Sequence, residues 1–411
     1  MNLYLFNYND SATVYGIGTY LKELTQSLAG SAIDVHIVHL RSERQKFEIE
    51  KADNIENWYI PEIRYDNKYF DAIQEIENYY RNVVYILRLY IKDAKDLIFH
   101  FNYNNCYFLA KELKATFDCQ TVATVHYTKW HLELQGNLHK LNRIKAKPEN
   151  QRNSFEQMMY IAVEYENAFF NEIGRVIAIS KLMQSILETE YQLNSDVIST
   201  VPNGLSDTNS IGTSNRENLR KKWQIPEKDF LILFVGRLQP VKGLIFLIRA
   251  FRKLLDQIPN CRLVIAGNGI YDPYFQEAKN ICTKITFTGL LEKRELYELY
   301  QLADVGVVPS LYEPFGYVAV EMMMHELPIV ATATSGLNEV VDDTCGLKVP
   351  LTVLPDCVEI DVSLLAEKIL YLLQHPAEAQ EMGRNGRKRY LKEYSSDVFR
   401  KNMLNFYKSL Y

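Results

Sequence analysis

Short apolar runs alternate with helix-forming stretches along this 411-residue chain, and the alternation occurs twice. Near the start, residues 3–6 form an apolar run, a turn with Gly16 and Gly18 follows, and residues 19–28 carry apolar side chains at helical spacing. Residues 35–40 form the next apolar run. A strand, a glycine turn, a helix and a second strand in this order are typical of a parallel βαβ unit.

The pattern predicts an α/β fold with two Rossmann-like, doubly wound domains. Further strands are expected at residues 97–101, 121–126, 176–179, 198–201, 230–235, 262–266, 284–287, 305–308 and 328–331, and helices at 68–96, 244–257 and 293–302. The runs in the second half are almost continuously apolar, as expected for a parallel sheet that is covered on both faces.

The polar segment 207–218 has few apolar residues and is interpreted as a linker. A chain of this length is too long for one ordinary core, so two domains are expected. We place the first domain at residues 1–205, the second at 206–390, and a helix at the chain end, 391–411.

Composition excludes several classes of protein. The net charge of −5 argues against nucleic acid as a partner. The six cysteines have no C-x-x-C spacing, which favours reduced, buried thiols. The chain start does not resemble a signal peptide, and no run of about eighteen apolar residues predicts a membrane helix. We therefore expect a cytoplasmic protein.

The segment FVGRLQPVKG, residues 234–243, contains the first candidate site. Gly236 ends a strand, and Arg237 and Lys242 follow it just before a predicted helix. Two cations beside a helix N-terminus are suited to a diphosphate, at the strand end where ligands of open α/β sheets bind. The spacing is not that of a Walker loop. The alternative is that both cations are solvated loop charges.

The segment 309–332 contains the second candidate site. Glu313 lies in the E-P-F-G turn that precedes a predicted helix, and Glu321 lies within that helix. Free amides at the start of a helix favour a phosphate, and carboxylates accept hydrogen bonds from sugar hydroxyls. The alternative for Glu321 is a glutamate that only stabilises the helix dipole.

These motifs resemble the GT-B superfamily and, within it, glycosyltransferase family four, which contains retaining nucleotide-sugar transferases. The resemblance rests on G-R-L-x-x-x-K-G, A-G-N-G, F-T-G, E-P-F-G-x-x-x-x-E and G-L-x-E-V-V in the second half, and on V-I-A-I-S-K and V-P-N-G in the first. It covers most of the chain and is loosest between residues 41 and 120. The resemblance implies that the two domains face each other across a cleft, with acceptor binding by the first domain, donor binding by the second, and a final helix that returns to the first.

The resemblance implies roles for single residues. Arg237 and Lys242 would neutralise the departing diphosphate, and Glu313 and His126 would lie near the transferred sugar. Glu321 would hold the ribose. The other donor-binding positions would be Gly16, Gly18, Gly236, Gly269, Leu290, Phe315, Gly316 and Tyr317. For His126 the alternative is a purely structural strand-end histidine.

The resemblance also implies a mechanism. The chain contains no Asp-x-Asp motif, so no metal and no further cofactor is expected. The anomeric configuration would be retained by same-face attack, without an enzymic nucleophile. The opening Gly-x-Gly lacks the third glycine of a dinucleotide fingerprint, which disfavours NAD.

Three alternatives stay open: a nucleotide-sugar transferase, with UDP favoured over GDP; a GT-B phosphorylase or sugar-nucleotide epimerase; and a non-catalytic relative that binds nucleotide sugars or proteins. The acceptor is not identified and would be a glycan, a lipid, a peptide or a small molecule. The basic segment 129–152 predicts either peripheral contact with the inner membrane face or a solvated charged insertion.

Overall fold

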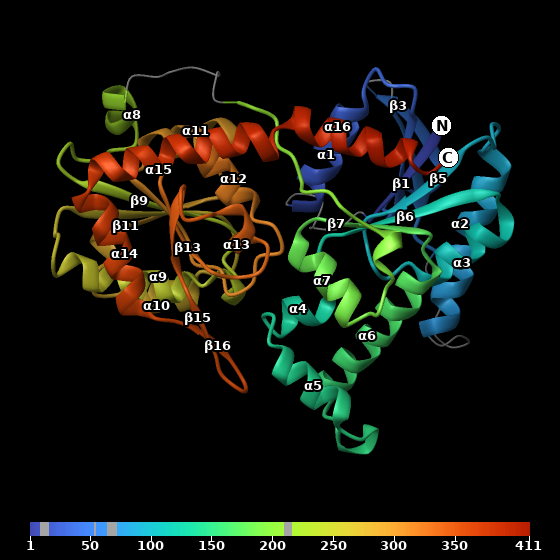
Figure 1. Cartoon of the computed structure of the whole chain (residues 1–411), viewed down its shortest axis with the longest axis horizontal. Helices are drawn as coiled ribbons and strands as arrows, with labels where there is room; N and C mark the ends of the chain where they lie inside the picture. Colours follow the sequence, from blue (N-terminus) through green and yellow to red (C-terminus); the bar gives the residue numbers. More distant parts are fainter. Residues whose placement is uncertain (9–15, 53–54, 64–71, 209–215) are drawn as a thin grey trace. The chain divides into compact units, whose positions relative to one another are not determined.

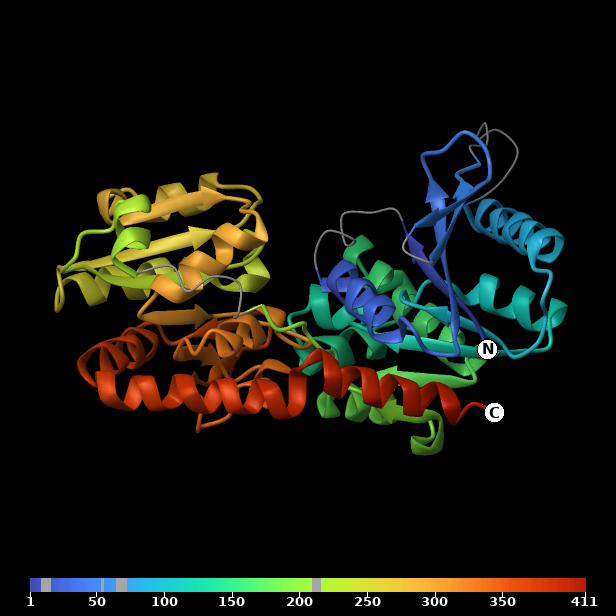
Figure 2. The same cartoon turned by 90° about the horizontal axis from the view of Figure 1, so that it is seen from above.

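The computed structural model describes residues 1–8, 16–52, 55–63, 72–208 and 216–411. The chain divides into two compact units. Unit 1 comprises residues 1–129, 147–204 and 396–411, and unit 2 comprises residues 130–146 and 205–395. Both chain termini lie in unit 1, near each other (Figures 1 and 2). Most of the opening loop and of the linker predicted at 207–218 lies outside the described residues, as do residues 68–71 of the long predicted helix.

Unit 1 contains an eight-stranded sheet in the order β3-β4-β2-β1-β5-β6-β7-β8. The strands are β1 (Asn2–Tyr8), β2 (Asp34–Ser42), β3 (Glu48–Ala52), β4 (Ile55–Pro61), β5 (Leu97–Phe101), β6 (Cys119–Val125), β7 (Arg175–Ala178) and β8 (Ile198–Thr200). All neighbours pair in parallel except β3 and β4. The central strand β5 is buried along its whole length, as its apolar sequence predicts.

The helices of unit 1 connect and cover these strands (Figure 1). They are α1 (Gly16–Leu28), α2 (Ala72–Tyr90), α3 (Tyr107–Thr116), α6 (Ser154–Glu172), α7 (Lys181–Thr189) and α16 (Ser396–Lys408), while the short α4 (Lys129–Glu133) begins at the boundary between the units. Helix α16 packs on α1, and α3 packs on both α2 and α6. A capping box, in which Asn153 and Glu156 exchange hydrogen bonds, fixes the start of α6.

Unit 2 contains a six-stranded parallel sheet in the order β11-β10-β9-β12-β13-β14. Its strands are β9 (Phe230–Val235), β10 (Cys261–Ala266), β11 (Ile285–Gly289), β12 (Val305–Val308), β13 (Ile329–Thr332) and β14 (Gly346–Val349), and β15 (Leu351–Val353) and β16 (Val358–Ile360) form a separate hairpin. Counted along the chain this is the order 3-2-1-4-5-6 of a Rossmann fold. The predicted α/β fold class is therefore confirmed.

Helices cover both faces of the unit 2 sheet (Figure 1). They are α8 (Arg216–Lys222), α9 (Leu244–Leu255), α10 (Asp272–Ala278), α11 (Lys293–Leu302), α12 (Tyr317–Met324), α13 (Leu337–Val340), α14 (Val362–Gln374) and α15 (Pro376–Arg389), and a π-helical turn at Tyr390–Tyr394 follows. Helix α5 (Leu138–Ala146) also belongs to unit 2 and contacts Asp356, between β15 and β16. Helix α9 packs against α10 and α14, and its inward side chains belong to one continuous apolar core with β9, β10 and β12.

The cysteines differ from the expectation in part. All six are free thiols; Cys106, Cys261 and Cys345 are buried, but Cys282 and Cys357 are exposed, so for these two the prediction of burial is wrong. Both exposed thiols lie at surface turns, Cys282 before β11 and Cys357 beside the β15–β16 hairpin, where no core is available to cover them.

Candidate functional site

The candidate site of unit 2 lies where the strand order reverses, between β9 and β12. In open α/β sheets, ligands bind outside the carboxyl ends of the strands at this switch point. The loop after β9 carries Gly236, Arg237 and Lys242, and the loop after β12 carries Glu313, Phe315 and Gly316. The fold therefore brings the two charged motifs of the second half together at the carboxyl ends of two neighbouring strands.

The two loops are in direct backbone contact. The amide of Leu311 donates to the carbonyl of Val241 at 2.7 Å. Gly243 has a φ of +66°, and a Cβ at this position would lie 1.8 Å from the carbonyl oxygen of Pro309. Only glycine fits here, because any side chain would push the two loops apart. This contact fixes the start of α9 against the loop after β12.

Lys242 and Glu313 form an ion pair across these loops. The distance from Lys242 Nζ to Glu313 Oε2 is 2.5 Å, and the side chains are 19% and 15% exposed. The Ser310 hydroxyl donates to the same carboxylate oxygen at 3.1 Å. The ammonium and the carboxylate are thus held in one geometry, close to solvent, with each partner balancing the charge of the other.

The E-P-F-G turn leads into α12 and is held by a second close approach. A Cβ at Gly336 would lie 1.9 Å from the carbonyl oxygen of Pro314, and the amide of Leu337 donates to the Glu313 carbonyl at 3.3 Å. Gly316 precedes α12, and no side chain caps that helix. The first-turn amides of α12 are therefore not satisfied by a capping side chain, a pattern that favours an anion.

Glu321 lies in α12 and is half-buried. Burial raises the pKa of its carboxyl, and a hydrogen bond from the Tyr300 hydroxyl at 2.7 Å opposes that shift. His325 Nδ1 lies 2.8 Å from the Glu321 carbonyl oxygen, and its ring stacks on Tyr300 with centroids 5.3 Å apart. Tyr300 and His325 therefore fix both the side chain and the backbone of Glu321.

The remaining predicted positions of unit 2 are more dispersed. Gly269 follows β10 and forms an isolated bridge with Leu238 in the loop after β9, so it joins the candidate site. Tyr317 is half-buried and packs edge-on against the buried Phe315, with centroids 5.2 Å apart. Leu290 is 59% exposed and follows the edge strand β11, which β10 separates from β9.

In unit 1 the strand order also reverses, between β1 and β5. Gly16 is exposed at the first residue of α1, and Gly18, two residues later, is half-buried. Residues 9–15, which complete the predicted glycine loop, lie outside the described residues. Both glycines therefore lie at the N-terminus of α1, the helix that follows β1, and β1 and β5 are the two middle strands of the sheet.

His126 directly follows β6 and is 7% exposed. Its Nε2 lies 3.3 Å from Asn102 Oδ1, and its ring packs edge-on against Tyr20 at 4.6 Å between centroids. Burial lowers the pKa of His126 to about 3, so the ring is neutral near pH 7. A neutral imidazole offers one hydrogen-bond donor and one acceptor rather than a charge.

The basic segment 129–152 is largely engaged within the protein. Arg143 pairs with Asp356, and Lys140 Nζ donates to the Asp356 carbonyl at 3.2 Å, both within unit 2. Lys147 pairs with Glu156 at 2.6 Å in unit 1. These contacts explain much of the charge of the segment without an external partner.

Sequence reasoning did not identify Ser310, Tyr300, Asn102 or Glu166. Ser310 lies in the same loop as Glu313 and was the only one with a local signal. Tyr300 contacts Glu321, Asn102 contacts His126, and Glu166 accepts the amide of Lys129, three residues after His126. These contacts come from the packing of different elements, which no spacing along the chain indicates.

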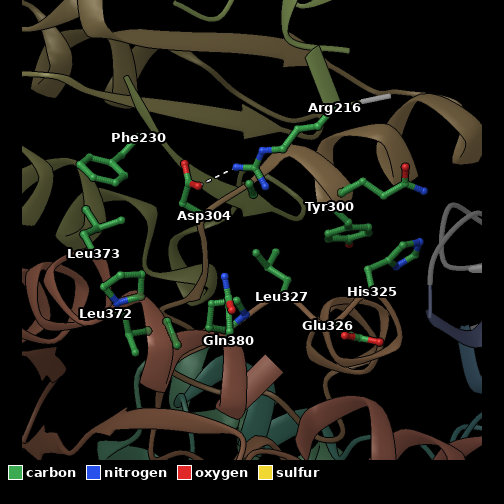
Figure 3. Close-up of a pocket in the computed structure, with 15 residues that line it drawn as sticks. Arg216, Phe230, Tyr300, Asp304, His325, Glu326, Leu327, Leu372, Leu373 and Gln380 are labelled. Carbon is green, nitrogen blue, oxygen red and sulfur yellow. Dashed lines mark hydrogen bonds and ion pairs between the residues drawn. The ribbon is translucent and has the colours of Figure 1, made fainter. Parts of the chain in front are cut away.

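A separate pocket of about 240 Å³ lies at the amino ends of the unit 2 strands, opposite the candidate site. Its walls include Phe230, Asp304 and Pro328, which begin or precede β9, β12 and β13. Arg216 pairs with Asp304 at 2.7 Å beside it, while Tyr300 and His325 line another wall (Figure 3). This pocket is at the amino ends of the strands and is not the predicted donor site.

Two models of protein families match the chain. The model described as glycosyltransferase family 4 matches residues 14–208, and the model described as glycosyl transferases group 1 matches residues 215–389. Together they cover most of the chain, in the order that the motifs indicated. The chain belongs to the GT-B glycosyltransferases, and within them to family four.

Individual relatives agree with this assignment. An uncharacterized glycosyltransferase of Methanocaldococcus jannaschii is 34% identical over 187 residues, which is 44% of this chain and 47% of the relative. The chain thus aligns with about half the length of the curated relatives it matches.

Two solved structures have the same fold. Sucrose-phosphate synthase of Thermosynechococcus elongatus has a TM-score of 0.76 at 22% identity and covers 100% of this chain and 98% of its own. HepE of Anabaena, solved in complex with UDP-glucose, has a TM-score of 0.70 at 15% identity and covers 99% of both chains.

Two features are absent from the described residues. In the described ranges, no helix is long and apolar enough to cross a membrane. No three His, Cys, Asp or Glu side chains among those same residues gather in a way that would hold a metal ion.

Proposed function

We propose that this protein is a glycosyltransferase that moves a sugar from a nucleoside-diphosphate sugar to an acceptor, with retention of the anomeric configuration and without a metal ion. The observation that carries the proposal is the Lys242–Glu313 pair at the switch point of unit 2. A cation and a carboxylate 2.5 Å apart match the two ends of such a donor, the phosphate and the sugar hydroxyls.

In this proposal the two charges separate when the donor binds. Lys242 and Arg237 contact the diphosphate, together with the uncapped amides at the start of α12. Glu313 accepts hydrogen bonds from hydroxyls of the transferred sugar. Glu321, fixed by Tyr300 and His325, accepts the ribose hydroxyls. His126 of unit 1 is neutral, and because its Nε2 donates to Asn102 Oδ1, its Nδ1 is the atom left to accept a hydrogen bond from a sugar hydroxyl.

The reaction follows from these contacts. The acceptor hydroxyl forms a bond to the anomeric carbon on the face that the phosphate leaves, while the bond from that carbon to the phosphate oxygen breaks. The proton of the acceptor hydroxyl passes to the departing phosphate oxygen. Lys242 and Arg237 stabilise the charge that develops there, a role in which a single pre-oriented group is worth roughly 3 kcal/mol.

We favour a uridine nucleotide over a guanosine nucleotide, and the fold shared with the HepE–UDP-glucose complex is in line with this choice. The acceptor is not identified. We also propose a cytoplasmic location, and peripheral membrane contact through residues 129–152 as a lesser candidate, because several of its basic residues have internal partners. Co-sedimentation with anionic vesicles tests that contact directly.

The test of the function is thermal stabilisation by UDP, GDP, ADP and their sugar forms, each with and without EDTA. A ligand that binds the folded state raises the melting temperature by mass action. We expect UDP and its sugars to stabilise equally with and without the chelator, and the variants Arg237→Ala and Lys242→Ala to lose the shift.

Arg249→Ala is the matched control, since Arg249 lies on the exposed side of α9 and pairs with Glu277 at 2.9 Å, away from the switch point. This variant should keep the full shift. If no nucleotide stabilises the protein, or if EDTA abolishes the shift, the metal-free transferase proposal is wrong. Turnover that requires inorganic phosphate would identify a phosphorylase instead.

A further inference from the structure

Glu166 is a buried acidic residue that is not among the proposed donor contacts. It lies in α6 and is only 6% exposed. A carboxylate is seldom buried to this extent without donors, because desolvation of the charge is expensive. The groups that donate hydrogen bonds to Glu166 therefore indicate its role.

The donors to Glu166 come from the turn after β6 and from its neighbours. Oε1 accepts the backbone amide of Lys129 at 2.9 Å and the side-chain amide of Asn104 at 3.3 Å. Oε2 accepts the hydroxyl of Tyr191 at 2.5 Å. Asn104 follows β5, so one carboxylate oxygen joins elements that follow two adjacent strands.

Asn104 extends this support along the turn. Its side-chain nitrogen also donates to the Tyr127 carbonyl at 2.6 Å. The backbone is thus held at Tyr127 by Asn104 and at Lys129 by Glu166. These two points lie one and three residues after His126, the unit 1 residue that the proposed function places near the transferred sugar.

On its other side His126 is held by Asn102, whose side-chain nitrogen donates to the Phe6 carbonyl at 3.2 Å. The imidazole therefore has a fixed partner within the sheet, while the backbone that follows it depends on Glu166 and Asn104. An apolar residue in place of Glu166 would leave the Lys129 amide without this acceptor, and a donor that loses its partner away from water destabilises the geometry around it.

We propose that Glu166 is a positioning residue that holds the turn 126–129 in the geometry needed for sugar transfer, by accepting the Lys129 amide and the Asn104 side chain. This inference rests on the proposed function, since it assumes that His126 acts on the sugar. Glu166 itself does not contact the substrate in this scheme. It acts through the backbone that follows His126.

The experiment compares Glu166→Leu and Glu166→Gln with wild type. Leucine removes both acceptor oxygens, whereas glutamine keeps one carbonyl oxygen for the Lys129 amide. Val163→Ala is the matched control: Val163 lies in the same helix, is buried, and its truncation weakens packing without removing an acceptor. Asn104→Ala removes the second support and serves if Glu166→Leu does not fold.

The first readout is amide hydrogen exchange of the peptide covering residues 126–130, which needs no substrate. We expect exchange to be at least about tenfold faster in Glu166→Leu and Asn104→Ala than in wild type and Val163→Ala, and restored in Glu166→Gln. The second readout is hydrolysis of UDP-glucose. We expect kcat to fall at least about tenfold in Glu166→Leu, KM to change less than about twofold, and glutamine to restore kcat.

The outcomes separate the two proposals. If wild type is stabilised by none of the nucleotides and hydrolyses none of their sugar forms, the proposed function fails, and with it the assumption about His126, whatever the exchange data show. If wild type is active and Glu166→Leu keeps wild-type exchange or wild-type kcat, the positioning role is wrong. A fall in kcat that Val163→Ala reproduces also overturns it, because general loss of stability would then be sufficient.

Discussion

The candidate residues of unit 1 and those of unit 2 are held by opposite physical principles. In unit 2 the key groups are charged and partly solvated, with Lys242 and Glu313 at 19% and 15% exposure. In unit 1 they are buried and held by hydrogen bonds, with a neutral His126 whose pKa burial lowers to about 3. Charges near solvent can exchange one partner for a ligand, whereas buried hydrogen-bonded groups cannot move cheaply.

This difference implies a division of labour within the proposed function. Unit 2 supplies the charge that meets the diphosphate, and unit 1 supplies pre-positioned neutral groups. Variants of unit 2 should therefore act mainly on binding and on leaving-group stabilisation. Variants of unit 1 should act on geometry, with little change in nucleotide affinity.

The largest effect is expected for Lys242→Ala. Removal of a cation that stabilises the leaving phosphate should lower kcat for sugar transfer or donor hydrolysis by roughly 10²–10³-fold. Steady-state kinetics with UDP-glucose measure this change, with Arg249→Ala as the control for loss of one positive charge. A loss of kcat below about threefold would mean that Lys242 contributes little to the leaving phosphate. The contrast between the charged residues of unit 2 and the neutral His126 of unit 1 would then have no functional meaning.

The second prediction tests whether close loop packing builds the charged half. Gly243→Ala should lower the free energy of unfolding by about 3 kcal/mol, because it adds a clash with the Pro309 carbonyl to the cost of a positive φ. Gly30→Ala is the control: Gly30 has a φ of +70° but no atom within 4 Å of the added Cβ. It should cost only about 1 kcal/mol.

Denaturant unfolding of both variants gives the comparison, and the excess cost at Gly243 measures the clash alone. Equal costs at the two positions would mean that the loop after β9 yields to the added methyl group. The fixed geometry of Lys242 would then not depend on the contact with Pro309.

The sequence predicted unit 2 better than unit 1 for a physical reason. Parallel strands buried on both faces are continuous apolar runs, so β9, β10 and β12 were apparent, whereas β3, with the sequence EIEKA, is a mostly exposed antiparallel edge strand without such a run. In unit 2 the glycines and charges of the site are grouped in two short loops.

In unit 1 the supporting residues are distributed over several elements. Glu166 and Lys129 are 37 residues apart and meet only because α6 packs beside the end of β6. Likewise Tyr300 and Glu321 belong to different helices of unit 2. Such contacts depend on how elements pack, and one sequence contains no local pattern that records them.

The third prediction concerns the charge state of the buried half. Burial raises the pKa of Glu166 to about 7, above its ordinary 4.5, although Tyr191, Lys129 and Asn104 all donate to it. The folded protein therefore binds more protons here than the unfolded chain between these two pH values. The contribution of Glu166 to stability is present below this window and is lost as pH rises through it.

Glu166→Gln does not titrate, so its free energy of unfolding should improve relative to wild type between about pH 5 and pH 8, by roughly 2 kcal/mol. Chemical unfolding of both proteins across this range measures the difference. A difference that is constant with pH would show that the three donors keep Glu166 ionised throughout. The buried half would then hold a permanent charge, and the contrast between the two halves would weaken.

The smallest effect is expected for Tyr300→Phe, which removes the hydrogen bond to Glu321 and leaves the ring in place. If Glu321 accepts the ribose hydroxyls, the affinity for UDP should fall about fivefold, in the range of one ordinary lost hydrogen bond. The affinity for a UDP analogue without ribose hydroxyls should not change. Calorimetric titration of both ligands gives the two ratios.

Tyr371→Phe is the matched control, because Tyr371 donates to Glu378 at 2.7 Å, the same bond at the same length, in an exposed part of unit 2. It should leave both affinities at their wild-type values. If Tyr300→Phe weakens UDP and the analogue equally, Tyr300 supports the fold around α12 rather than the ribose contact of Glu321. Tyr300 would then act in unit 2 as Glu166 is proposed to act in unit 1, by positioning other residues. The contrast between charged groups in unit 2 and positioned groups in unit 1 would hold only for the loops after β9 and β12.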